Sequence, residues 1–164
     1  MTELTAERAR ELFDYDQSTG VLAWKMQPRK RYKPSLTAGY KRKDGYLTTQ
    51  ADGRAYLNHR IIWLLVTGSW PSEQVDHVNG IRNDNRIGNL REATHSANCE
   101  NRRLAAADNP TRYLGVSLHK QSKKYQASIR VNGRQMYLGL FSTAEAAYAA
   151  YLTAKRQHHK GCTI

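Results

Sequence analysis

Hydrophobic residues in the N-terminal part of the chain recur with the period of a helix in some stretches and of a strand in others. An Asp52-Gly53 pair between two alternating runs is typical of a tight hairpin turn. Asn58 is expected to cap the apolar helix that follows, and Gly68 to end it. The expected elements are a helix over residues 5–13, strands over 21–25, 45–50 and 54–57, and a helix over 58–66.

The last third of the chain shows the strand pattern three times before it changes to the pattern of a helix. Asn132-Gly133 joins the second and third runs and is a strong hairpin signal. The segment from Ser142 to Glu145 has the form of a capping box, which predicts the start of a helix. The expected elements are strands over residues 113–118, 125–131 and 134–140, and a helix from 142 to about 155.

Between these parts lies a polar, asparagine-rich stretch over residues 75–103. It predicts a short strand over residues 75–78, an Asn79-Gly80 turn, an irregular loop, and a helix capped by Thr94 or Ser96 that ends near residue 104. Small residues followed by Asp-Asn-Pro then indicate a linker. We therefore expect an α+β chain with a first domain over residues 1–104 (lead-in 1–70, polar motif 74–104), a linker over 105–111 and a second domain over 112–164.

Positive charge is concentrated in two places. The net charge is +12, and residues 101–164 alone hold 11 Lys or Arg and 2 acids. Residues 25–43 hold eight basic residues and no acid, and the prolines and glycine of residues 29–43 predict an irregular loop. Such runs neutralise phosphates and release counterions, so the expected partner is a nucleic acid. No apolar run approaches the length that spans a bilayer, so no membrane partner is expected.

The two cysteines, Cys99 and Cys162, form no CxxC pair. Neither a zinc ribbon nor a disulfide framework is indicated, and a reducing, cytoplasmic compartment fits. The polar, acidic N-terminus lacks the pattern of a signal peptide. The chain shows no heptad repeat or long apolar helix, so we expect a monomer or a weak dimer.

Asp76, His77, Asn89 and Asn98 are the candidate chemical groups of the polar stretch. Asp76 and Asn98 offer oxygen ligands of the kind that Mg²⁺ accepts while it keeps several waters. His77 is the natural base for deprotonating a water at neutral pH, and Asn89 would orient its ring. Consecutive residues of a strand point to opposite faces, so Asp76 and His77 reach one site only if the strand ends there. The alternative is an ordinary polar pair beside a structural loop.

The order of these residues resembles the HNH motif of phage and intron-associated homing endonucleases. The matching pieces are Asp76-His77, Asn89-Leu90-Arg91, Ser96-Ala97-Asn98 and Asn101-Arg102. The resemblance implies a ββα-metal nuclease core in which His77 activates water and Asn89 positions the histidine and braces the loop. It also implies that Asp76 and Asn98 bind the metal.

Asn98 stands where many HNH enzymes have a second histidine. The resulting oxygen-only ligand set favours Mg²⁺ or Mn²⁺ over Zn²⁺. Asn85 and Asn101 are expected to be structural or to contact phosphates, and His59 to be a packing or backbone-contact residue.

The second domain resembles an AP2/ERF-type DNA-binding domain over residues 112–161, on the segments 113–116, 125–130, 137–141 and 143–151. The resemblance implies that a three-stranded sheet, backed by one helix, reads the major groove of double-stranded DNA. Leu114 and Tyr137 replace an arginine and a tryptophan of the plant domains, which puts the target sequence in question. The expected base-contacting residues are His119, Ser128, Arg130 and Tyr137. The expected phosphate-contacting residues are Lys120, Lys123, Lys124 and Arg134, joined by Arg102 and Arg103 after the motif.

Together these patterns favour a metal-dependent DNA endonuclease of the HNH homing type, which nicks or cuts double-stranded DNA and is targeted by its second domain. It would act in the cytoplasm, that of the host cell if a phage encodes it. The alternative is a non-catalytic, sequence-specific DNA-binding protein, transcriptional or autoregulatory, with a degenerate HNH scaffold. An RNA partner also fits the charge, but the exposed aromatic pairs expected for single-strand stacking are lacking.

Overall fold

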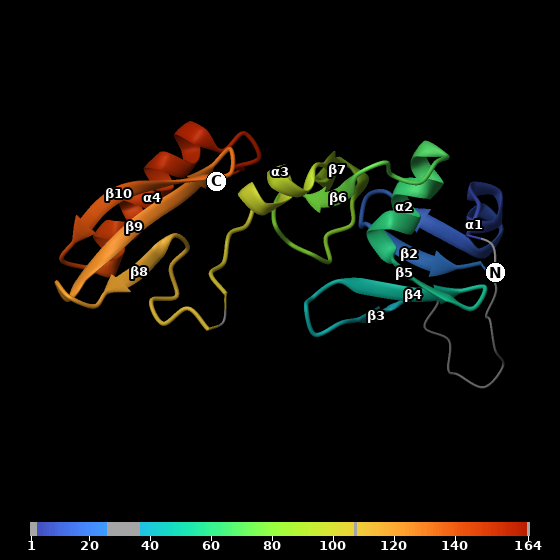
Figure 1. The fold of residues 1–164 in the computed structure, drawn as a ribbon. Helices are drawn as coiled ribbons and strands as arrows, with labels where there is room; N and C mark the ends of the chain where they lie inside the picture. The colour runs from blue at the N-terminus through green and yellow to red at the C-terminus, as the bar shows by residue number, and fades with distance from the viewer. Residues whose placement is uncertain (1–2, 26–36, 107, 164) are drawn as a thin grey trace. The chain divides into compact units, whose positions relative to one another are not determined.

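The structure, a computed structural model, describes residues 3–25, 37–106 and 108–163 (Figure 1). Its internal contacts divide the chain into two compact units, Met1–Thr94 and His95–Ile164. The division falls before the linker that the sequence predicts at residues 105–111, so the helix of the polar motif groups with the second unit. The functional boundary at the linker stays a prediction.

The first unit is built from short antiparallel strands and two helices (Figure 1). The strand pairs and sheets are β1–β2, β3–β4–β5 and β6–β7. Its elements are α1 (Ala6–Leu12), β1 (Phe13–Asp16), β2 (Val21–Trp24), β3 (Tyr40–Lys41), β4 (Leu47–Ala51), β5 (Arg54–Leu57), α2 (Asn58–Thr67), β6 (Gln74–His77), the 3₁₀ turn η1 (Ile87–Asn89) and β7 (Leu90–Ala93).

Local sequence explains most of these boundaries. The Thr5 side chain accepts a hydrogen bond from the Arg8 amide and caps α1. The β4–β5 hairpin turns at Asp52 and Gly53, with φ of 45° and 81°, as the Asp-Gly pair predicts. Gly68, in the left-handed conformation, ends α2 as expected, because its N–H bonds back to the Leu64 carbonyl.

Two expectations for this unit are wrong. Asn58 does not cap α2: it is buried, its Oδ1 accepts from the Thr49 hydroxyl at 2.7 Å, and its Nδ2 donates to the Ala38 carbonyl at 2.8 Å. The Asn58 side chain thus forms tertiary hydrogen bonds rather than the local cap that the sequence predicts. The expected loop over residues 29–43 contains the short strand β3, while its residues 29–36 lie outside the described part.

The core of the first unit joins α1 and α2 to the strands. Ala9, Ile61 and Ile62 are fully buried, and Phe13 and Leu22 lie with them in one apolar cluster. Phe13 also explains why α1 is shorter than expected, since it leaves the helix to pair with Trp24 across β1 and β2. The polar motif that follows is therefore carried on a packed scaffold.

The second unit contains one short helix, a three-stranded antiparallel sheet and a long helix. These are α3 (His95–Glu100), β8 (Val116–His119), β9 (Lys124–Val131), β10 (Arg134–Phe141) and α4 (Ala144–His158). The sequence predicts the β9–β10 hairpin correctly, with φ of 49° at Asn132 and 78° at Gly133. It predicts a longer α3, and the cap of α4 is Thr143 rather than Ser142, because the Thr143 hydroxyl accepts from the Ala146 amide.

Helix α4 covers one face of this sheet. Ala127 and Ile129 of β9 are buried, and Ala147 and Tyr151 of α4 pack against them. Gly115 lets the chain pass this helix: its φ is +69°, and an added Cβ would lie 2.0 Å from the Tyr151 ring. In the described part of the chain, no helix has the length and apolar character needed to cross a membrane.

Candidate active site

Asp76 and His77 are the last two residues of β6, and both are buried. The strand ends where the sequence requires it, because the Gly80 N–H turns back to the His77 carbonyl at 2.8 Å. The side chains of Asp76 and His77 nevertheless have different hydrogen-bond partners. Asp76 lies opposite Arg91 of β7, whose Nε and terminal nitrogen both donate to Asp76 Oδ2, at 3.2 and 3.0 Å. Arg91, for which the sequence predicts no role, therefore binds Asp76, the expected metal ligand.

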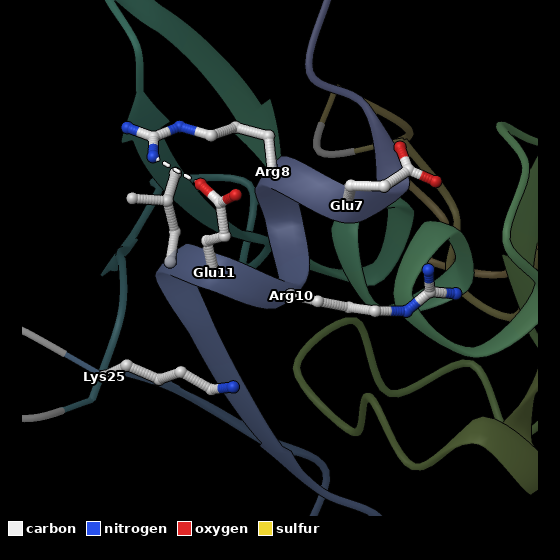
Figure 2. A pocket seen from close by; sticks show the side chains of 6 residues that line it. Glu7, Arg8, Arg10, Glu11 and Lys25 are labelled. Atoms are coloured by element: carbon white, nitrogen blue, oxygen red, sulfur yellow. Dashed lines mark hydrogen bonds and ion pairs between the residues drawn. The ribbon is translucent and has the colours of Figure 1, made fainter.

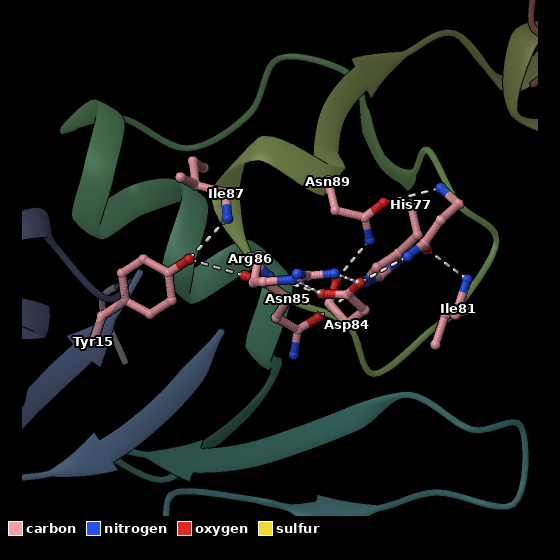
Figure 3. A network of polar contacts seen from close by, with 9 residues as sticks. Tyr15, His77, Ile81, Asp84, Asn85, Arg86, Ile87 and Asn89 are labelled. Atoms are coloured by element: carbon pink, nitrogen blue, oxygen red, sulfur yellow. Dashed lines mark hydrogen bonds and ion pairs between the residues drawn. The ribbon is translucent and has the colours of Figure 1, made fainter. Parts of the chain in front are cut away.

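The His77 ring is held by Asn85. Nε2 of the ring and Oδ1 of Asn85 lie 2.9 Å apart, and both side chains are almost fully buried (Figure 3). With Oδ1 as the acceptor, the ring donates from Nε2 and the neutral imidazole keeps its lone pair on Nδ1. The sequence pattern left Asn85 between a structural and a phosphate-contacting role, and the structure makes it the orienting partner.

Asn89 is expected both to position the histidine and to brace the loop, and its hydrogen bonds fit the second role. Its Nδ2 donates to the Asp84 carbonyl at 2.7 Å (Figure 3). Its Oδ1 accepts from the Asn79 amide at 2.9 Å, and its backbone carbonyl accepts from the Val78 amide at 2.8 Å. Both side-chain groups are thus committed to the loop backbone. The sequence does not indicate which asparagine contacts His77, because that depends on the path of the loop.

A second set of contacts fixes that path. The Asp84 carboxylate binds Arg86 at 2.6 Å and the Asn79 side chain at 2.7 Å. The hydrogen bond from Arg86 is the main cause that lowers the pKa of Asp84, to about 2. From the other side, the Tyr15 hydroxyl donates to the Asn85 carbonyl at 3.0 Å and accepts from the Ile87 amide at 2.8 Å (Figure 3).

Two further aromatic side chains surround the histidine. The rings of His59 and His77 meet edge to face with centroids 5.0 Å apart, and the Tyr46 ring lies 5.3 and 5.8 Å from them. Burial, with smaller effects from His77 and Arg60, lowers the pKa of His59 to about 3. His59 is therefore neutral at neutral pH, and its ring packs against those of Tyr46 and His77.

The environment of His77 also keeps it neutral before reaction. Burial lowers the pKa of His77, and the charge of Arg82 adds to this effect. The Asn85 hydrogen bond and the charges of Asp76 and Asp84 raise the pKa and oppose the shift. A buried, neutral imidazole with carboxylates nearby can take up a proton and share the resulting charge, which suits a general base.

The remaining expected active-site residue lies in the second unit. Asn98 is half-buried on α3, so the first unit alone contains one expected metal ligand, Asp76. The described part of the chain holds no group of three or more His, Cys, Asp or Glu side chains suited to a metal. Carboxylate and amide oxygens are nonetheless ligand types that a hard cation such as Mg²⁺ accepts while it keeps most of its waters.

Helix α3 and the residues after it are tied to the C-terminal end of the chain. Lys155 is buried, its pKa is lowered by that burial, and its Nζ donates to the Arg102 carbonyl. Further bonds run from the Gly161 amide to Glu100, from the Thr163 hydroxyl to Asn101, and from Arg103 to the Thr163 hydroxyl. Arg103, an expected DNA contact, thus uses part of its guanidinium inside the unit, whereas Arg102 is exposed.

The expected DNA-reading residues share one face of the C-terminal sheet. The register sets Ser128 opposite Tyr137, Arg130 opposite Gln135 and His119 opposite Lys124, and directly opposed residues lie on the same face. Their β9 neighbours Ala127 and Ile129 point to α4, so this is the uncovered face. Gln135, whose amide donates to Ser128 at 3.0 Å, belongs to it and was missed by the sequence patterns.

The other expected DNA contacts lie around this sheet. Lys120 and Lys123 belong to the β8–β9 turn, while Arg134 begins β10 and pairs with Val131. The side chain of Tyr137 is exposed, at 59%. These positions fit a polar, basic surface with one prominent ring.

A pocket beside α1 has no part in this chemistry. Charged side chains of α1 and Lys25 line it, and Arg8 is bound there by Glu11 at 2.8 Å (Figure 2). Arg8 also forms an ion pair with Asp52 at 3.0 Å. None of the expected catalytic or metal-binding residues lies in its wall.

Comparison with known families places the polar motif. Residues 56–99 match the family model described as HNH endonuclease. The matched segment runs from β5 to α3 and contains His59, Asp76, His77, Asn85 and Asn98. It supports an HNH nuclease domain in this part of the chain. No curated protein and no solved structure matches the chain.

Proposed function

We propose that this protein is a DNA endonuclease of the HNH homing type that hydrolyses phosphodiester bonds in double-stranded DNA. One observation carries the proposal: within the segment that matches HNH endonucleases, the structure buries His77 at the end of β6 and fixes its ring through Asn85. A buried histidine oriented by a side chain of a braced loop is what a general base requires.

In the proposed reaction, His77 accepts a proton from a water as the water oxygen attacks phosphorus. The bond from phosphorus to the 3′ oxygen breaks and the 3′ oxygen takes a proton from solvent, which leaves a 3′-hydroxyl and a 5′-phosphate. Asp76 would help to hold a divalent cation, Mg²⁺ or Mn²⁺, which when bound neutralises charge on the phosphate and on the leaving oxygen, and Asn98 stays the second ligand that the sequence predicts. Asn85 keeps the imidazole in one orientation and shares the charge of the imidazolium.

We further propose that the second domain brings the nuclease to its DNA. The support is the shared face of His119, Ser128, Arg130 and Tyr137, which α4 leaves uncovered, together with the excess of basic residues after residue 100. Side chains from one face of a sheet can reach base edges in the major groove.

The test is relaxation of a supercoiled plasmid that carries the gene and its flanking DNA. The full chain is assayed with Mg²⁺, with EDTA, as His77→Ala and as His158→Ala, an exposed histidine at the end of α4 that serves as the matched control. We expect Mg²⁺-dependent relaxation that is lost in His77→Ala and kept in His158→Ala. Binding without relaxation by the unaltered chain would instead establish the non-catalytic alternative.

A further inference from the structure

Three arginines follow His77 within the first unit, and they differ in their partners. Arg86 forms an ion pair with Asp84 at 2.6 Å, and Arg91 forms one with Asp76 at 3.0 Å. Arg82 has no carboxylate partner among the residues that the structure describes. Within the described residues, its positive charge beside the candidate active site is therefore not paired with a carboxylate.

Arg82 is nevertheless held in a defined position. Its guanidinium nitrogen Nη1 donates to the Asp44 carbonyl at 2.6 Å, and its guanidinium carbon lies 5.2 Å from the centroid of the Tyr46 ring. Stacking of this kind fixes a guanidinium without neutralising it. The aliphatic part of the side chain passes Gly45, where an added Cβ would lie 3.8 Å from Arg82 Cδ.

The same Tyr46 ring connects Arg82 to the histidine. One ring thus contacts the exposed guanidinium and lies 5.8 Å from the buried His77 imidazole. Arg82 is exposed, so an anion that approaches His77 from solvent can meet it. A rigidly held cation next to a base is an arrangement that stabilises charge developing on a reacting phosphate.

We propose that Arg82 binds a non-bridging oxygen of the scissile phosphodiester and stabilises its charge during cleavage. The inference rests on the proposed function and adds to it a phosphate-binding residue supplied by the loop after β6. Arginine suits this role because its planar guanidinium presents several donors to a phosphate at once. The competing explanation is that Arg82 only pins the loop to the β3–β4 turn through the Asp44 carbonyl.

Two substitutions separate charge from pinning. Arg82→Gln keeps a hydrogen-bond donor for the Asp44 carbonyl and removes the charge, whereas Arg82→Lys keeps the charge. Arg54→Gln, at an exposed arginine that begins β5 in the same unit, is the matched control. Each full-length variant is assayed for single-turnover relaxation of supercoiled plasmid with Mg²⁺, and for binding to the same DNA in EDTA.

We expect Arg82→Gln to lower the single-turnover rate about 100-fold while the dissociation constant changes no more than about threefold, because the loss falls on the transition state. Arg82→Lys should recover about a tenth or more of the rate, and Arg54→Gln should cleave normally. Equal rate losses in Gln and Lys, or a loss confined to binding, would overturn the assignment in favour of pinning or simple DNA affinity.

Failure of the proposed function remains distinguishable. If the unaltered chain relaxes the plasmid and Arg82→Gln does so equally fast, only the role of Arg82 is refuted. If the unaltered chain and all variants leave the plasmid intact in Mg²⁺, the nuclease assignment and the role of Arg82 fall together.

Discussion

Removal of one hydroxyl group, in Tyr15→Phe, should weaken both the fold and the candidate site. The hydroxyl donates to the Asn85 carbonyl and accepts from the Ile87 amide, across 70 or more residues of sequence. At about 1 kcal/mol for each hydrogen bond, the loss is about 2 kcal/mol. For a unit of this size, that corresponds to a fall in Tm on the order of 10 °C.

The effect on cleavage follows from the neighbouring bond. Asn85 orients the His77 ring at 2.9 Å, so a shift of its backbone misplaces the base. A misplacement on the order of 1 Å costs up to about 100-fold in rate, and we expect a loss of about 10- to 100-fold at saturating DNA. Since Tyr15 would act through Asn85, adding Tyr15→Phe to Asn85→Ala should cause little further loss of rate.

The assay pairs thermal unfolding, followed by circular dichroism, with single-turnover plasmid relaxation. Tyr56→Phe is the matched control, because the Tyr56 hydroxyl accepts a 3.2 Å bond from the Leu4 amide, outside the candidate site. It should lower Tm slightly and leave the cleavage rate unchanged. A normal rate in Tyr15→Phe despite a lower Tm, or additive rate losses in the double variant, would refute the positioning role.

Three further predictions concern other parts of the chain. The pKa of His59 is about 3 in the folded protein and near 6.5 in the unfolded chain, so the unfolded chain binds more protons between these pH values. The free energy of unfolding should therefore fall as the pH drops from 6.5 toward 3. His59→Phe should make this fall smaller, as measured by unfolding curves recorded at pH 7.5 and 4.5. Gly115→Ala should lower Tm by about 10 °C or more, because the new Cβ collides with the Tyr151 ring at a positive φ; an unchanged melting curve would show that the chain moves aside. A chain that ends near Ala107 lacks Lys155, which donates a hydrogen bond to the Arg102 carbonyl just after α3. It should therefore lose both cleavage and DNA affinity. Cleavage at the full rate under saturating DNA would show that α3 does not need this hydrogen bond.

The sequence by itself determined the turns and the kinds of chemical group. Asp52-Gly53, Asn79-Gly80 and Asn132-Gly133 all turn the chain where they stand. Both residues of the first and last pairs take positive φ angles, and in the middle pair Gly80 alone does. The adjacent acid and histidine of β6 and the asparagine-rich loop were also visible, and the family match covers them.

Only the tertiary structure decided which side chains work together. The ring of His77 meets Asn85 rather than Asn89, because Tyr15, from a distant strand, sets the path of the loop. Asp76 meets Arg91 because two strands pair in one register. Hydrogen bonds between residues far apart in the chain depend on where packing brings their backbones, and a linear pattern carries no record of that distance.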